Sequence, residues 1–195
     1  MLINRAPKFG NDIDYIDSIV ASILNDFYKI VKEESKKFDW LKLNPGIGTF
    51  ESYAKFGNSV GASADGRKAR GPLASNYSPS IGLDKNGPTA AIKSATRSDL
   101  SKYMAGCPID LSINVNEVSG KAGIEKLKSL IKSFKELGGQ IMTLTISSKE
   151  VYRDAQIHPE RHRGLRVRLG GFSSYFITLP KEHQDIMIRR LSHTG

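Results

Sequence analysis

The chain has 195 residues, of which 39% are hydrophobic and 25% are charged, as in a folded domain or a large piece of one. It contains no apolar run near the roughly 20 residues that cross a membrane, and residues 1–5 lack the apolar core of a signal peptide. We therefore expect a cytoplasmic protein. The single cysteine excludes an intrachain disulfide. The net charge of +9 would permit an acidic partner.

The first predicted element is a helix over residues 12–37, for which Asn11 or Asp12 can provide the cap. Residues 41–86 are rich in glycine, proline and serine and predict a long irregular connection. The run that begins at Gly87-Pro88 predicts a turn into a helix or a buried segment. In the first helix, apolar residues at helical spacing predict one buried stripe: Ile13, Ile16, Ile19, Val20, Ile23, Leu24, Phe27, Tyr28 and Val31.

The second half of the chain shows alternating helical and strand-like patterns. Its last predicted strand runs directly into two adjacent glycines, and Ile186, Met187 and Leu191 form the apolar side of its last helix. In chain order we predict a helix over 121–137 with Ser119 near its cap and Gly138-Gly139 at its end, a strand over 140–146, a short helix with a capping box from Ser147 to Glu150, a strand over 165–169, and a helix that starts near Pro180.

Basic residues cluster between His158 and Arg168, where four arginines fall within a few positions. Such a cluster could contact phosphates, but it lacks the interleaved aromatic residues on which single-stranded nucleic acids stack, and no zinc-finger spacing occurs. We therefore interpret it as a solvated or interdomain face, and expect neither a nucleic-acid partner nor a membrane partner.

One run near the C-terminus places the paired glycines between an apolar strand and several aromatic residues: Arg166-Val167-Arg168-Leu169-Gly170-Gly171-Phe172-Ser173-Ser174-Tyr175-Phe176. A bare Gly-Gly is usually a turn. The whole run, however, resembles the radical-bearing loop of glycyl radical enzymes, in which the glycine directly before the aromatic residue stores an unpaired electron on its α-carbon. That glycine is Gly171. A flattened α-carbon radical would be crowded by a Cβ, which glycine lacks.

The resemblance extends over nearly the whole chain. The aromatic residues Phe172, Tyr175 and Phe176 are expected to pack the loop when it is docked in the barrel. Further matching segments follow one another in the family's order: Ala6-Pro7-Lys8-Phe9-Gly10-Asn11-Asp12, Asp65-Gly66-Arg67-Lys68-Ala69, Pro72-Leu73-Ala74, the stretch from Gly82 to Ala90, Ser94, Gly138-Gly139, Ser148-Lys149-Glu150, Asp154-Ala155-Gln156, His158-Pro159-Glu160, Gln184-Asp185-Ile186 and Arg189.

The resemblance implies an α/β fold corresponding to the C-terminal part of a ten-stranded glycyl radical enzyme barrel. Residues 1–64 would be the end of the barrel domain, and residues 65–195 the glycine radical domain. It also implies that Gly171 is the catalytic residue, with no metal or cofactor bound to the chain itself. An activating enzyme that uses S-adenosylmethionine and an iron–sulfur cluster would install the oxygen-sensitive radical.

In such enzymes the stored radical passes to a cysteine on a loop far upstream of the glycine, and we expect this chain to begin after that loop. Cys107 lies in a segment that resembles the family's Gly-x-Leu-Leu-Asn segment, and a lone cysteine is more often a small core residue than a reactive one. The expected partners are therefore the activating enzyme and a larger, cysteine-bearing chain. The sequence leaves a homo-oligomer open.

Three interpretations of the chain follow. It is the glycine-bearing subunit of a split enzyme of lyase, dehydratase or decarboxylase type, an interpretation favoured by the N-terminal helix. Alternatively, it is a stand-alone protein that restores an oxygen-damaged enzyme, or a non-enzymatic interaction module. Two departures from the family's pattern put the substrate class in doubt: Thr143-Leu144-Thr145 replaces Gln-x-Asn, and Pro108-Ile109-Asp110 replaces Leu-Leu-Asn.

Overall fold

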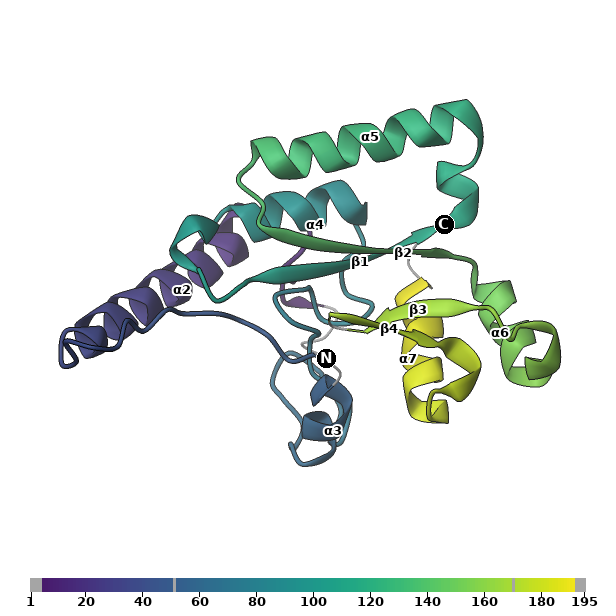
Figure 1. The fold of residues 1–195 in the computed structure, drawn as a ribbon, viewed down its shortest axis with the longest axis horizontal. Coiled ribbons are helices and arrows are strands. Elements are labelled where there is room, and N and C mark those ends of the chain that lie inside the picture. Colours follow the sequence, from purple (N-terminus) through teal and green to yellow (C-terminus); the bar gives the residue numbers. More distant parts are fainter. Residues whose placement is uncertain (1–4, 51, 170, 192–195) are drawn as a thin grey trace.

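The computed structural model describes residues 5–50, 52–169 and 171–191, and it combines helices with two small sheets (Figure 1). The central sheet pairs β1 (Pro108–Asn114) with β2 (Ile141–Ser147) in parallel. A short 3₁₀ helix (Val115–Val118) and α5 (Gly120–Glu136) connect the two strands. Parallel neighbours require such a crossover because each strand must return to the same end of the sheet.

One face of this sheet carries the larger hydrophobic core. Ile109, Leu111 and Ile113 alternate with polar residues along β1 and are almost fully buried. They pack with residues of α4 (Gly87–Thr96) and α5, which lie on that side of the sheet in Figure 1. Because side chains alternate across a strand, Asp110 and Ser112 project from the opposite face. The predicted strand over 140–146 corresponds to β2.

The second sheet is an antiparallel hairpin of β3 (Arg166–Leu169) and β4 (Phe172–Tyr175). A separate core supports it, made with α6 (Lys149–Ile157) and α7 (Lys181–Arg190). In this core the rings of Tyr152 and Phe176 stack with their centroids 4.6 Å apart. Short 3₁₀ helices at Leu100–Lys102, Pro159–Arg161 and Phe176–Thr178 complete the connections.

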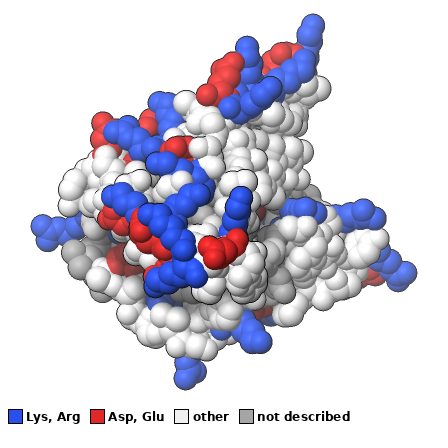
Figure 2. Space-filling view, turned by 60° about the vertical axis from the view of Figure 1, so that its left-hand side comes forward, with Lys and Arg blue, Asp and Glu red and all other residues white. Residues whose placement is uncertain are grey.

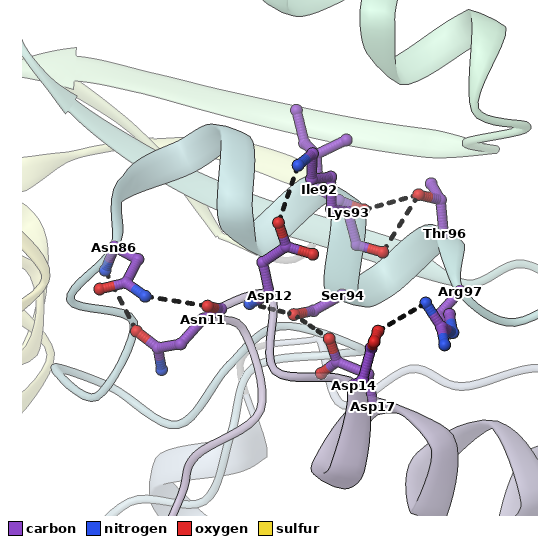
Figure 3. A network of polar contacts seen from close by, with 10 residues as sticks. All are labelled: Asn11, Asp12, Asp14, Asp17, Asn86, Ile92, Lys93, Ser94, Thr96 and Arg97. Atoms are coloured by element: carbon purple, nitrogen blue, oxygen red, sulfur yellow. Dashed lines mark hydrogen bonds and ion pairs between the residues drawn. The ribbon is translucent and has the colours of Figure 1, made fainter.

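The N-terminal segment is fastened to α4 by polar contacts (Figure 3). Asn11, one of the two predicted caps, instead accepts hydrogen bonds from the backbone N–H groups of residues 85 and 86. The other predicted cap, Asp12, pairs with Lys93 at 2.8 Å. The residue that caps α2 (Asp14–Ser35) is Ile13, without a side-chain hydrogen bond. The prediction of the cap was wrong because both side chains have partners distant in sequence.

The apolar stripe predicted for α2 is only partly covered. Val20 and Leu24 pack on the main core, but Ile19 is 40% exposed and Ile23 is 62% exposed. The helix projects from the body of the molecule (Figure 1), and only part of its apolar stripe packs on the core. The periodicity therefore identified the helix correctly but overstated how much of it this chain buries.

Two further local predictions need correction. The connection over residues 41–86 contains a helix, α3 (Ser52–Asn58), whose Tyr53 is buried against α7. The capping serine of α6 is Ser148, not Ser147, because the Ser148 hydroxyl accepts a hydrogen bond from the N–H of Val151 at 3.2 Å. The helix over 121–137 does end at Gly138, which has a left-handed φ of 80°.

Charges of both signs lie close together on the face shown in Figure 2. Several lysines pair with acids three or four residues away on the same helix, as Lys36 does with Glu33 and Lys181 with Asp185. Such exposed pairs contribute little stability. Within the described parts of the chain, no helix combines the length and apolarity needed to cross a membrane.

Candidate functional site

Gly171 lies in the turn of the β3–β4 hairpin. Leu169 at the end of β3 pairs with Phe172 at the start of β4, so Gly171 lies in the connection between the two strands. Gly171 has a φ of 121°, a backbone conformation that residues with a Cβ rarely adopt. Gly170, the other glycine of the motif, lies outside the described residues. The sequence motif therefore falls on a tight turn whose conformation requires glycine at position 171.

The α-carbon of Gly171 faces the ring of Phe50. A methyl group built on that α-carbon would lie 3.8 Å from both Cδ1 and Cε1 of Phe50, an ordinary contact distance. Free space would therefore admit a side chain at Gly171, and the backbone conformation is what excludes one. Phe50 itself is 62% exposed and has a φ of 48°.

A cavity of about 310 Å³ lies beside Gly171. Besides Asn76 and residues 105–106, its walls come from three parts of the chain: the connection before α3, the polar face of the β1–β2 sheet, and the hairpin. Ile47 and Phe50 come from the first, Asp110 and Thr143 from the second, and Arg168 from the third. The fold thus brings the hairpin glycine to the open face of the central sheet.

Asp110 is the centre of the polar contacts in this cavity. Its carboxylate accepts hydrogen bonds from the Ser75 hydroxyl at 2.5 Å and the Asn76 side-chain amide at 2.8 Å, and from the Thr143 hydroxyl. Its backbone N–H donates to the hydroxyl of Ser78 at 2.8 Å. Asn76 in turn accepts hydrogen bonds from the N–H groups of Thr49 and Phe50.

The two departures from the family's pattern therefore meet in space. Asp110 and Thr143 occupy paired positions in the register of β1 and β2, and their side chains are hydrogen-bonded. The sequence showed each departure separately, but nothing in it showed that they are neighbours. The roles of Asn76 and Phe50 were also missed, because they depend on contacts between residues that are far apart in the chain.

Cys107 turns away from this cavity. Gly106 and Pro108 line the cavity, whereas Cys107 between them is 1% exposed and belongs to the main core. Burial raises the pKa of its thiol to about 12. A neutral, enclosed thiol is a poor nucleophile. The structure thus places Cys107 as a core residue.

The three aromatic residues of the loop have different environments. Phe176 is completely buried, as expected for a residue that packs the loop. Phe172 and Tyr175 are 44% and 43% exposed in this chain, so their packing of the docked loop stays a prediction. They lie on β4, whose burial pattern shows mostly exposed residues.

Two of the other matching segments support the hairpin. Gln156 on α6 donates a hydrogen bond to Asp185 on α7 at 2.8 Å. Gln184 donates to the backbone oxygens of Phe176 and Leu179, both at 3.1 Å. These bonds tie α6, the segment after β4, and α7 together. Segments that are separate motifs in the sequence thus form one supporting unit beneath the hairpin.

His162 and Asp154 form another close pair, 2.6 Å apart, near the end of α6. This hydrogen bond lowers the pKa of the Asp154 carboxyl. The pair lies at the surface and does not line the cavity beside Gly171. Across the described ranges, no cluster of three or more histidine, cysteine or acidic side chains could hold a metal ion.

Comparisons with known proteins agree with this geometry. The profile of the glycine radical family matches residues 73–177, and that of the pyruvate formate lyase-like family matches residues 1–57. A probable dehydratase of Escherichia coli (strain K12) is 32% identical over 98% of this chain. Trans-4-hydroxy-L-proline dehydratase of Clostridioides difficile is 31% identical over the whole chain. In both cases the chain covers 24% of the relative's length.

A solved structure shows the same arrangement. The glycerol-bound form of the B12-independent glycerol dehydratase from Clostridium butyricum superposes with a TM-score of 0.89 at 33% identity, covering 99% of this chain and 24% of that one. The predicted fold class is confirmed: this α/β chain corresponds to part of a glycyl radical enzyme barrel. With a family profile matching more than half of its residues, the chain belongs to the glycine radical family.

Proposed function

We propose that this chain is the glycine-bearing component of a glycyl radical enzyme and that it stores the radical on the α-carbon of Gly171. The observation that carries the proposal is the position of Gly171. It lies in a hairpin turn with a φ of 121°, and its α-carbon faces Phe50 at the edge of a cavity. Gly120 and Gly138 also have positive φ, but they lie at the two ends of α5.

The chemistry of the radical explains the requirement for glycine. Removal of one α-hydrogen atom leaves an unpaired electron, which is stabilised when the α-carbon becomes planar and conjugates with both adjoining peptide groups. A Cβ would crowd that arrangement, and glycine has none. In this proposal a separate activating enzyme, using S-adenosylmethionine and an iron–sulfur cluster, removes the hydrogen atom.

The second radical carrier would be a cysteine of another chain. Cys107 is enclosed in the core and does not line the cavity beside Gly171, so its sulfur atom is unsuited to exchange hydrogen atoms with Gly171 or a substrate. The chain also spans only about a quarter of the length of its relatives. A larger partner chain would therefore supply the cysteine and most of the substrate contacts.

We infer a lyase-type reaction, because the two relatives described above are named as dehydratases. Several substrate classes are compatible with one radical loop, since the loop generates the radical and other residues recognise the substrate. The identity of the substrate thus depends on the partner chain and on the few side chains that this chain contributes to the cavity.

Electron paramagnetic resonance tests the proposal directly. The purified chain is incubated anaerobically with an activating enzyme and S-adenosylmethionine, and the expected spectrum is a doublet produced by the remaining α-hydrogen of Gly171. Exposure to air should then cleave the backbone at Gly171, which mass spectrometry detects. The Gly171→Ala variant should lose both the doublet and the cleavage.

The Gly138→Ala variant is the matched control. Gly138 has a φ of 80° and no atom within 4 Å of an added methyl group, so the substitution strains the backbone without touching the hairpin. It should keep the doublet at full intensity. A full signal from Gly171→Ala would overturn the assignment. No signal from the unaltered chain, with an activating enzyme proven competent on another protein, would favour a non-enzymatic interaction module.

A further inference from the structure

Hydrogen bonds link the central sheet to the aromatic ring that faces Gly171. We propose that Asp110 is a positioning residue for the radical site: its carboxylate orients Asn76, and Asn76 holds Phe50 against the α-carbon of Gly171. This inference rests on the proposed function of Gly171. Asp110 lies on β1, sixty-one positions before the glycine, and acts only through other residues.

Phe50 needs an external support to keep its place. Its side chain is 62% exposed, so packing does not fix it, and its φ of 48° lies in the left-handed region. A non-glycine residue in that region is strained and persists only where the surrounding structure holds it. Hydrogen bonds to its backbone are therefore the available restraint.

Asn76 supplies that restraint. Its side-chain oxygen accepts hydrogen bonds from the backbone N–H groups of Thr49 at 2.9 Å and Phe50 at 3.2 Å. Its own backbone N–H donates to the hydroxyl of Thr49 at 2.8 Å. Asn76 is itself buried and has a left-handed φ of 52°. One of these three hydrogen bonds joins the two left-handed residues, Asn76 and Phe50, and the other two join Asn76 to Thr49.

Asp110 determines which way the Asn76 amide points. A carboxylate only accepts hydrogen bonds, so the NH₂ group of Asn76 must face Asp110 and its oxygen must face Thr49 and Phe50. The hydroxyls of Ser75 and Thr143 donate to the same carboxylate and fix its orientation. Without Asp110 the amide loses its anchor and can rotate away from the backbone of Phe50.

The ring of Phe50 lies on one side of Gly171, separated from its α-carbon by about the space of one methyl group, and Phe50 and Gly171 line the same cavity. An aromatic ring in that position narrows the approach of water and oxygen from that side. The expected consequence of losing Asp110, Asn76 or Phe50 is therefore a shorter-lived radical, with no change in the chemistry that forms it.

Amide hydrogen exchange, measured residue by residue by NMR without any activating enzyme, tests the positioning role. In Asp110→Ala we expect the amides of Thr49 and Phe50 to exchange roughly tenfold faster, as for the loss of a charge-assisted hydrogen bond. Asp110→Asn, which preserves the volume, should give a smaller increase. Ser112→Ala, on the same face of β1, is the matched control and should leave both rates unchanged.

Unchanged exchange in both Asp110 variants would overturn the positioning role. The second readout is the decay of the radical doublet at a fixed low oxygen pressure. Phe50→Ala and Asp110→Asn should start at the full signal and decay severalfold faster than the unaltered chain, whereas Phe56→Ala, a substitution of another exposed phenylalanine, should not. Equal decay rates would overturn the shielding by Phe50.

The two readouts separate this inference from the proposed function. If the unaltered chain gives no doublet with a competent activating enzyme, the proposed function fails, while the exchange rates still decide whether Asp110 positions Phe50. If the doublet forms and the exchange rates do not respond to Asp110, only the positioning role fails.

Discussion

Gly171 and Cys107 differ in where the backbone places them, Gly171 at the cavity and Cys107 in the core. Gly171 reaches the cavity because the hairpin turn exposes its backbone, and the residues on either side of Cys107 reach the same cavity. Cys107 itself projects into the core, as alternation along an extended segment requires. The sulfur atom of Cys107 therefore lies in the core and not at the cavity that Gly171 lines.

We predict that the Cys107 thiol is unreactive in the folded chain. Burial raises its pKa to about 12, so the fraction present as thiolate at pH 8 is very small. Its reaction with a chromogenic disulfide reagent at pH 8 should be at least about a hundredfold slower than in the guanidinium-unfolded chain. A Cys107→Ala variant should still form the radical doublet. Rapid labelling of the native chain would contradict this view.

At the level of single residues, the sequence predicts the radical site at Gly171 because the motif is local and the proposed chemistry admits only glycine, and this assignment stays a prediction. It did not identify Phe50, Asn76 or Asp110 as neighbours of that glycine. Their contacts join residues dozens of positions apart, and such contacts depend on how the sheet and the hairpin are placed in space. Asp110 was visible only as a departure from the family's pattern, without a physical role.

Among the elements, α2 depends on a small polar network for its attachment to α4. The Asp17 carboxylate is 3% exposed and accepts a hydrogen bond from the Ser94 hydroxyl at 2.9 Å, as Figure 3 shows. The Ser94 hydroxyl also accepts a hydrogen bond from the backbone N–H of Asp12. Burial raises the pKa of the Asp17 carboxyl, an effect that the hydrogen bond from Ser94 partly opposes.

This raised pKa gives a stability prediction with a definite sign. The folded chain binds the proton of Asp17 more tightly than the unfolded chain does. Protonation of Asp17 therefore contributes to the free energy of unfolding below the unfolded pKa, and this contribution is lost as pH rises through the folded pKa. We expect Asp17→Asn to raise the free energy of unfolding at pH 7 by about 1 kcal/mol, because an uncharged amide is less costly to bury than a carboxylate.

Urea denaturation at pH 7 and near pH 3 measures the difference in the free energy of unfolding between Asp17→Asn and the unaltered chain. This difference should shrink at the lower pH, because Asp17 is then protonated. Asp14→Asn is the control: Asp14 pairs with Arg97 at 2.8 Å, but its side chain is 83% exposed, so its replacement should change stability little. An Asp17→Asn difference of the same size at both values of pH would contradict the assignment.

Most elements were predictable because their periodic patterns are strong. The helices corresponding to α2 and α5 and the strand β2 were predicted within a few residues. The helix α3 was missed, because its seven residues lie in a glycine-rich connection and owe their burial to contacts with α7. The division near residue 64 into a barrel part and a radical domain stays a prediction.

At the scale of the whole molecule, the outer side of α2 is apolar and open. Tyr15, Ile19, Ile23, Phe27 and Ile30 recur every three or four residues, and each is at least 40% exposed. Just beyond the helix, Trp40 is 82% exposed. Contiguous apolar surface of this kind usually marks an interaction site. Under the proposed function, its occupant is the larger, cysteine-bearing chain.

The only tryptophan of the chain therefore offers a selective reporter of that assembly. With 5-fluorotryptophan at Trp40, we expect the ¹⁹F resonance to shift and to lose its sensitivity to solvent when the cysteine-bearing chain is added. Ile23→Glu places a charge in the apolar stripe and should weaken association roughly tenfold or more. Lys29→Glu, a matched substitution of an exposed polar residue on the same helix, should weaken it far less. Equal binding by both variants would show that the partner does not cover this face of α2.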